Sequence, residues 1–128
     1  MHSVIISIGS NTPDRWERVA EAIRWLGGIT MSGRASTIYT SAPEGNCAKL
    51  INYNYSNAVY SAMTPHSQQE MEQILKKYEQ EAGRTQQMKT FGIVPIDLDL
   101  VFFDKHVLRP VELTRNYFLR GYKEIFLS

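Results

Sequence analysis

The chain has 128 residues, of which 43% are hydrophobic and 21% are charged, a balance typical of a soluble domain that buries its own core. Its net charge of +1 gives no sign of a nucleic-acid or membrane partner, so local charges must hold any anionic ligand. The single cysteine excludes an internal disulfide, and no apolar run approaches the roughly 20 residues of a membrane span. Residues 1–11 lack the features of a signal peptide. We therefore expect one cytoplasmic domain over residues 1–128, and we also expect a monomer.

The first half of the chain predicts a strand, a helix and two more strands. Residues 3–9 are short, β-branched and apolar, and they end at a turn signal, which predicts the first strand. Apolar side chains recur at helical spacing over residues 16–26, and the glycine pair at 27–28 predicts the end of that helix. Residues 29–41 and 52–63 are rich in strand-forming side chains, so they predict two strands joined by a loop.

The second half predicts one helix and one long strand. Ser67 and Glu70 have the spacing of a capping box before an amphipathic stretch that Gly83 ends, and this pattern predicts a helix. After a polar loop, residues 96–103 read as an apolar strand that contains two acids. Residues 104–107 then predict a tight turn into a short return strand.

This order, β-α-β-β-α-β, predicts a ferredoxin-like α+β sandwich, an antiparallel sheet with helices on one face. Asp97 and Asp99 lie two positions apart in a strand, so both are expected on the open face of the sheet. Tyr55 and Asn57 alternate in the same way, and they would lie beside the acids if they share that face. The helix side of the last strand is then expected to carry Ile96, Leu98, Leu100 and Phe102.

Two aspartates at this spacing suit a divalent cation. Their Cα atoms lie about 7 Å apart in a strand, so the carboxylates can converge on one cation or bridge two. Ligands that offer only oxygen suit Mg²⁺, which is often coordinated by protein carboxylates and nucleotide phosphates together. The acid pair therefore predicts magnesium-assisted phosphoryl transfer. The alternative is that both acids are merely solvated, and the spacing alone favours that alternative.

Neighbouring polar and aromatic residues also have two interpretations. Tyr55 and Asn57 would suit a flat heteroaromatic ligand, because they offer an aromatic face and an amide, yet both are ordinary on a strand surface. Arg84 follows the helix-ending Gly83, where it either compensates the helix dipole or clamps a phosphate.

Five separated motifs are spread along the chain: "IGSN" at 8–11, "IYTSAPEG" at 38–45, "YSNAV" at 55–59, "EQEAGR" at 79–84 and "IDLDLVFF" at 96–103. Together they resemble the 6-hydroxymethyl-7,8-dihydropterin pyrophosphokinase family. They occur in that family's order and spacing, and the resemblance covers residues 3 to about 103. It implies transfer of the β,γ-pyrophosphoryl group of ATP, the co-substrate, onto the hydroxymethyl group of a reduced pterin in folate synthesis, with two Mg²⁺ ions.

The resemblance also implies roles for individual residues. Asp97 and Asp99 match the family's metal-holding acids, and with Arg84 and Lys89 they are the expected catalytic residues. The "RNYFL" segment resembles a family segment that brings Arg115 to phosphate. The expected nucleotide-binding residues are thus Glu79, Arg84 and Arg115, and the expected pterin-binding residues are Ser41, Pro43, Tyr55, Asn57, Phe91 and Tyr117.

The chain departs from the family's pattern on the ATP side. Phe91 stands where the family has tryptophan, and Val94 and Gln86 replace basic residues, with Lys89 as the nearest substitute. A proline-histidine segment before Arg115 is missing. An arginine that stabilises transferring phosphate can contribute several powers of ten in rate, so these changes put catalytic competence in question.

Three hypotheses follow from the sequence. The first is an active, divergent pyrophosphokinase that binds a small pterin and ATP. The second is a catalytically impaired homologue that only binds a pterin or a nucleotide. The third is an RNA-binding module, since such domains share the element order and stack bases on sheet aromatics. Near-neutral charge and two acids on the sheet face argue against the third.

Overall fold

A six-stranded antiparallel sheet forms the centre of the fold in the computed structural model, which describes residues 1–42 and 53–127. The strand order is β2-β4-β1-β5-β6, and β3 pairs with β4. The strands are β1 His2–Ser10, β2 Met31–Ala35, β3 Tyr39–Ser41, β4 Tyr55–Thr64, β5 Asp97–Phe103 and β6 His106–Val107. The helices are α1 Arg15–Ile29, α2 Gln68–Glu81, α3 Gln86–Phe91, the 3-10 helix η1 Pro110–Thr114 and α4 Asn116–Phe126.

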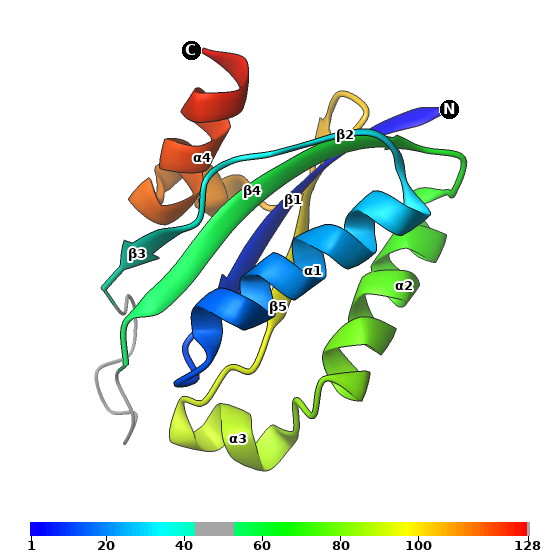
Figure 1. Ribbon diagram of the computed structural model, residues 1–128. Helices are drawn as coiled ribbons and strands as arrows, with labels where there is room; N and C mark the ends of the chain where they lie inside the picture. Colours follow the sequence, from blue (N-terminus) through cyan, green and yellow to red (C-terminus); the bar gives the residue numbers. More distant parts are fainter. Residues whose placement is uncertain (43–52, 128) are drawn as a thin grey trace.

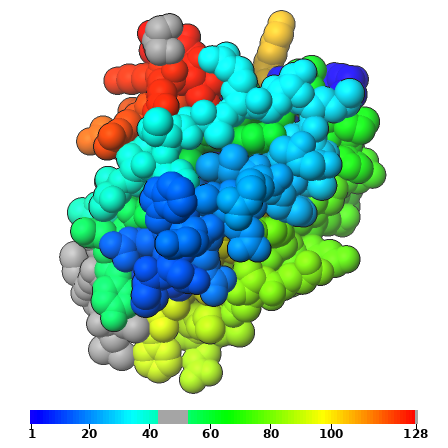
Figure 2. All heavy atoms as spheres, viewed as in Figure 1, coloured from blue at the N-terminus to red at the C-terminus, as the bar shows by residue number. Residues whose placement is uncertain are grey.

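Helices cover both faces of this sheet. Helices α1 and α2 lie side by side on one face, and α4 lies on the other (Figure 1). The space-filling view from the same side shows α1 and α2 covering the sheet, with the β5–β6 hairpin protruding at the top (Figure 2). The predicted ferredoxin-like α+β fold is confirmed, but the second face is not open, because α4 packs on part of it. No described helix is long and apolar enough to cross a membrane.

Each face of the sheet has its own hydrophobic core. Strand β1 lies between β4 and β5, and Val4, Ile6 and Ile8 are almost fully buried on the face that α1 and α2 cover. Burial of such side chains contributes about 1.5–3 kcal/mol each and drives the packing of both helices. The smaller core under α4 consists of Val59, Val101, Phe118 and Ile125.

Local hydrogen bonding determines where α2 begins, whereas packing against the rest of the fold determines where α1 ends. The capping box of α2 is present: Glu70 N donates to Ser67 Oγ at 3.2 Å, and Ser67 N donates to Glu70 Oε1 at 2.9 Å. The predicted stop of α1 at 27–28 is wrong, because the helix runs on to Ile29. A Cβ at either glycine would meet nothing within 4 Å, so both lie on an open helix surface while Leu26 is buried.

Two segments contain structure that was not predicted. The polar loop after Gly83 includes α3, which Thr85 caps through Met88 N and which ends at Gly92 with φ of 83°. Glycine tolerates this left-handed conformation without a Cβ penalty. The stretch predicted as one strand at 29–41 is divided into β2 and β3, and β2 is irregular, with Ser32 at φ of 55°.

The alternation predicted for the acid-bearing strand holds for only part of its length. Leu98 and Leu100 face α1 and α2 as predicted, but Phe102 packs with the core under α4. The register of β5 against β1 shifts between Ile5 and Ile6, which is the signature of a bulge that reverses the facing of later residues. The prediction for Phe102 is therefore wrong. The turn into a return strand is present, and Asp104 adopts a φ of 52° there.

Candidate active site

The ends of four strands bring the predicted polar residues together at one end of the sheet. Gly9 near the end of β1 pairs with Asn57 of β4 on one side and with Asp97 of β5 on the other. Two residues earlier, Ser7 pairs with Asp99. These strand ends meet at the lower end of the sheet, on the side of α3 (Figure 1). Antiparallel register therefore places an amide and two carboxylates around the end of β1.

A cavity of about 170 Å³ lies beside this row of residues. Asn57 Nδ2 donates to Ser41 Oγ at 2.6 Å, which fixes the amide between β4 and β3. Aromatic side chains and an amide around a small cavity can bind a flat heteroaromatic ring. Its lining includes the predicted residues Ser41, Tyr55, Asn57, Asp97, Arg115 and Tyr117. We call this the aromatic cavity.

Gly9 leaves room for this cavity. A Cβ at Gly9 would lie 3.3 Å from Asn57 Oδ1 and 3.6 Å from Tyr55 Cδ2. We expect Gly9→Ala to weaken binding of a flat pterin-like ligand roughly tenfold, because the methyl group pushes Asn57 out of place, a cost of about 1.4 kcal/mol. Fluorescence titration with a pterin measures this effect.

The matched control for that substitution is Gly27→Ala in α1. A Cβ at Gly27 meets nothing within 4 Å, so the alanine should leave ligand binding unchanged and stabilise the helix by roughly 0.5–1 kcal/mol. Equal pterin affinity of the Gly9→Ala protein and the parent chain would show that Gly9 does not shape the cavity.

Helix α4 supplies the far wall of the aromatic cavity, and Tyr39 of β3 anchors that helix. The hydroxyl of Tyr39 accepts a hydrogen bond from Gly121 N at 3.0 Å and donates to the carbonyl oxygen of Tyr117. A Cβ at Gly121 would lie 2.6 Å from Val59 Cγ2, so glycine is needed for this close approach. Tyr117 is thereby placed opposite β4.

Arg84 links the last turn of α2 to the first residue of β5. Its Nη1 lies 2.8 Å from Asp97 Oδ1 and 3.1 Å from Glu79 Oε2. Glu79 Oε2 also accepts from Leu98 N at 2.7 Å. Burial, the largest influence, raises the pKa of Glu79, and the nearby guanidinium opposes that rise. These contacts form a part-buried network that orients Asp97.

The environment of Asp99 opposes ionisation of its carboxyl group. Burial and then the neighbouring charge of Asp97 raise the pKa of Asp99 from an ordinary value of 3.8 to about 8, and Arg109 opposes this shift. The Arg109 guanidinium lies 3.4 Å from Asp99 Oδ1. A divalent cation bound beside Asp99 would favour its ionised form and oppose this shift.

The acid pair fits a cation that is shared with a ligand. No group of three or more His, Cys, Asp or Glu side chains that could hold a metal occurs in the described part of the chain. Asp97 and Asp99 supply only carboxylate oxygens, and Mg²⁺ commonly binds one or two carboxylates and completes its shell with water and phosphate. The donor set is therefore suited to Mg²⁺ brought with a phosphate ligand.

A second cavity, of about 780 Å³, lies between α2, α3 and β5. Glu79, Arg84, Lys89 and Asp99, all predicted site residues, line it. Asp97 lines both cavities, which therefore meet at this residue. We call this larger space the charged cavity.

Not every predicted residue lies where its expected role requires. Phe91 is 36% exposed on α3, and it is not among the described residues that line either cavity. Arg115, expected at the nucleotide, lines the aromatic cavity instead. Pro43 lies outside the described residues. Gln86 lines the charged cavity, whereas Val94 is buried at 8% exposure.

Sequence reasoning missed several residues of the site. Ser7 and Gly9 line the aromatic cavity, and the strand pairing of β1 with β5 could have located them. Arg109 and Glu112 lie in no recognised motif, so no sequence signal marked them.

Glu112 is a buried acid beside Tyr117. The residue is 6% exposed, and its Oε2 has no hydrogen-bond partner among the described residues. Burial, followed by the hydrogen bond to Glu112, raises the pKa of the Tyr117 hydroxyl.

Comparison with known families agrees with this geometry. The family model for 7,8-dihydro-6-hydroxymethylpterin-pyrophosphokinase (HPPK) matches residues 5–126. The chain belongs to the HPPK family. The predicted resemblance is thus confirmed, and the match extends beyond residue 103, through α4, so the helix that places Tyr117 is part of the HPPK domain.

Curated HPPK relatives are similar over most of this chain. The 2-amino-4-hydroxy-6-hydroxymethyldihydropteridine pyrophosphokinase of Aquifex aeolicus is 33% identical over 109 residues, which are 85% of this chain and 66% of that protein. A folate synthesis bifunctional protein of Arabidopsis thaliana is 32% identical over 105 residues, 80% of this chain. A mitochondrial one of Pisum sativum is 33% identical over 113 residues, 87% of this chain. The chain spans only 21% of each of these two plant proteins.

Proposed function

We propose that the chain transfers the β,γ-pyrophosphoryl group of ATP to 6-hydroxymethyl-7,8-dihydropterin in folate biosynthesis, with Mg²⁺. The observation that carries this proposal is the position of Asp97, which lines both the aromatic and the charged cavity. A ring in the first cavity and a polyphosphate in the second would meet at the acid pair. We also propose that residues 1–128 act as a single, monomeric domain.

The aromatic cavity would orient the acceptor. Tyr55 and Tyr117 offer ring faces, and Asn57 presents its Oδ1 beside Gly9 while its Nδ2 is held by Ser41. A fixed amide selects a ring edge with a matching donor, because an unpaired buried amide oxygen costs free energy. This arrangement would point the hydroxymethyl group of the pterin toward the acids.

The charged cavity would position the donor. The acceptor hydroxyl gives its proton to water as its oxygen attacks the β-phosphorus, the bond from that phosphorus to the oxygen of the α-phosphate breaks, and AMP leaves with that oxygen. Asp97 and Asp99 would hold two Mg²⁺ ions, which when bound supply positive charge to the transferring group. Arg84 keeps Asp97 in place, and Lys89 adds a cation from α3. Catalysis of this kind depends mainly on positioning and charge.

The test is formation of AMP from ATP with the purified chain. AMP should appear only when both Mg²⁺ and 6-hydroxymethyl-7,8-dihydropterin are present, in a one-to-one ratio with the pyrophosphorylated pterin. Folded protein that releases no AMP under these conditions contradicts the proposal.

A second candidate function is pterin or nucleotide binding without turnover. Gln86 places a neutral side chain in the charged cavity, and Val94 is buried and is not among the described residues that line it. Both positions carry basic residues in the resembling family. Calorimetry that shows pterin binding by a chain that forms no AMP would favour this candidate, and measurable turnover excludes it.

A further inference from the structure

The charged cavity has no surplus of positive charge for a polyphosphate. Two of its cations face acids at short range: Arg84 lies 2.8 Å from Asp97, and Arg109 lies 3.4 Å from Asp99. The negative charge of an entering polyphosphate must therefore be balanced by arginines released from these pairs or by cations that enter with the ligand. The basic lining residues are Lys76, Arg84, Lys89 and Arg109, and the acidic ones are Glu72, Glu79, Asp97 and Asp99.

Position 94 cannot supply the missing charge. The backbone of Val94 is fixed by Asn11, whose Oδ1 accepts from Val94 N at 2.6 Å and whose N donates to Val94 O at 3.0 Å. Its side chain is 8% exposed. The compensating cation has to come from another element that borders the cavity.

The two arginines of the cavity are held very differently. Arg84 is 23% exposed and is bound through Nη1 by Glu79, by Asp97 and by the carbonyl oxygen of Ile96 at 3.4 Å. The Arg109 side chain is 53% exposed, and its contact with Asp99 is a 3.4 Å ion pair. Only Asp99, at 18% exposure, is on the buried side of this pair, and the guanidinium end is open to solvent, so the guanidinium can exchange partners. Arg84 therefore has a structural role, whereas the guanidinium of Arg109 can leave Asp99 for another partner.

We propose that Arg109 is a phosphate-binding residue that contacts Asp99 when the cavity holds no ligand and transfers its guanidinium to the polyphosphate when Asp99 takes up a cation. The planar guanidinium suits this exchange, because it matches the geometry of carboxylate and phosphate alike. Arg109 would thus replace the positive charge that Val94 and Gln86 do not provide. This inference rests on the proposed function, since it assumes a nucleotide in the charged cavity.

The experiment compares nucleotide binding by Arg109→Ala, Arg109→Lys and the parent chain. The ligand is α,β-methylene-ATP, whose transferable bond cannot break, and calorimetry measures its dissociation constant with Mg²⁺ present. We expect Arg109→Ala to weaken binding roughly ten- to a hundredfold. The affinity of Arg109→Lys for the analogue should lie between those of Arg109→Ala and the parent, since lysine keeps the positive charge and loses the two-pronged hydrogen bonding of the guanidinium. Binding of adenosine, which has no phosphate, should be unchanged in all variants.

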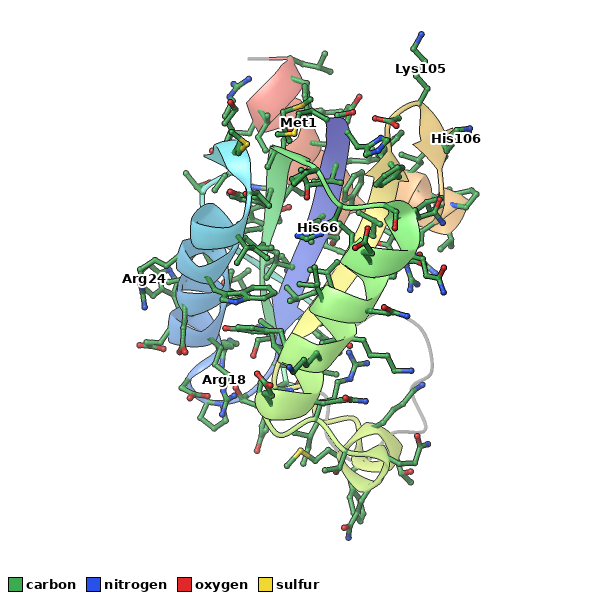
Figure 3. All side chains as sticks on the ribbon, turned by 90° about the vertical axis from the view of Figure 1, so that its right-hand side faces the viewer. Met1, Arg18, Arg24, His66, Lys105 and His106 are labelled. Atoms are coloured by element: carbon green, nitrogen blue, oxygen red, sulfur yellow. The ribbon has the colours of Figure 1, made fainter. Side chains whose placement is uncertain are left out.

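The matched control is Arg24→Ala, because Arg24 is an exposed arginine on the outer side of α1, away from α2 (Figure 3). This variant should bind the analogue like the parent chain, and all variants should unfold at similar temperatures. Equal analogue affinity in Arg109→Ala and Arg24→Ala overturns the inference, as does an equal loss of adenosine binding, which would indicate a structural role. A parent chain that forms no AMP contradicts only the proposed function, because the titration still decides the role of Arg109.

Discussion

Replacing Asp99 by asparagine is expected to reduce AMP formation at least a thousandfold and yet to stabilise the metal-free protein. The loss follows because a carboxylate that would hold Mg²⁺ at the transferring phosphate is removed, and such charge stabilisation contributes on the order of 10³ in rate. The gain follows because asparagine has a similar shape and does not bring a second negative charge next to Asp97.

The pH dependence of this gain has a definite sign. The pKa of Asp99 is about 8 in the fold, against 3.8 ordinarily, so the folded state keeps a proton that the unfolded chain has lost. The unfolding free energy of the metal-free protein should therefore fall as pH rises from about 4 to about 8, and Asp99→Asn should lack this slope. At pH 8 we expect its melting temperature to exceed that of the parent by roughly 5 °C or more.

Thermal unfolding in chelator across this pH range provides the measurement. Asp104→Asn is the control, because hydrogen bonds from His2 and Ser3 lower the pKa of that exposed aspartate, so its removal should not stabilise the fold. Added Mg²⁺ with α,β-methylene-ATP should stabilise the parent and have little effect on Asp99→Asn. If the melting temperatures of the parent and of Asp99→Asn changed with pH in the same way, Asp99 would not be a carboxyl group whose ionisation the metal-free fold opposes.

Removing the cation of the network at the end of α2 should damage both stability and activity. Arg84→Ala leaves Glu79 and Asp97 without their shared partner, and Glu79 is only 16% exposed. Loss of one partner of a buried pair costs 3–5 kcal/mol, and partial solvent exposure reduces this to about 2 kcal/mol. Turnover should fall at least a hundredfold, because Asp97 loses the contact that orients it.

Urea unfolding measures the stability change, with Lys77→Ala as the matched control. Lys77 and Glu81 form an exposed i,i+4 pair at 3.9 Å, whose loss should cost less than about 0.5 kcal/mol. If Arg84→Ala were no less stable than Lys77→Ala, the Glu79–Arg84–Asp97 network would not hold this end of the sheet together.

The elements that depend on local chemistry were predictable, and those that depend on the rest of the fold were not. The capping box at Ser67 and the strand alternation at Leu98 and Leu100 are properties of short sequence stretches, and both occur as predicted. The bulge that turns Phe102 arises from pairing with β1, which the sequence of β5 alone does not specify. Helix α1 passes its two glycines because Ile29, directly after them, packs against the core, and this packing outweighs a weak local preference.

The same division applies to the candidate site. The side chains of Tyr55, Asn57 and Asp97 meet as the alternation of two strands indicated, and the family motifs mark the same positions. Arg109 could not be recognised, because it lies outside every motif and reaches Asp99 through the chain's path after β6. The balance of acidic and basic residues in the charged cavity can be counted only when the fold shows which residues line it.

The seating of α4 on Tyr39 has a consequence for how the two cavities respond to local unfolding. Helix α4 spans Asn116–Phe126 and carries Tyr117, which lines the aromatic cavity, whereas the residues that line the charged cavity come from other elements. Local opening of α4 would therefore remove one wall of the aromatic cavity and leave the acid pair and the charged cavity in place. The ring-binding half of the site can be lost while the phosphate-binding half persists.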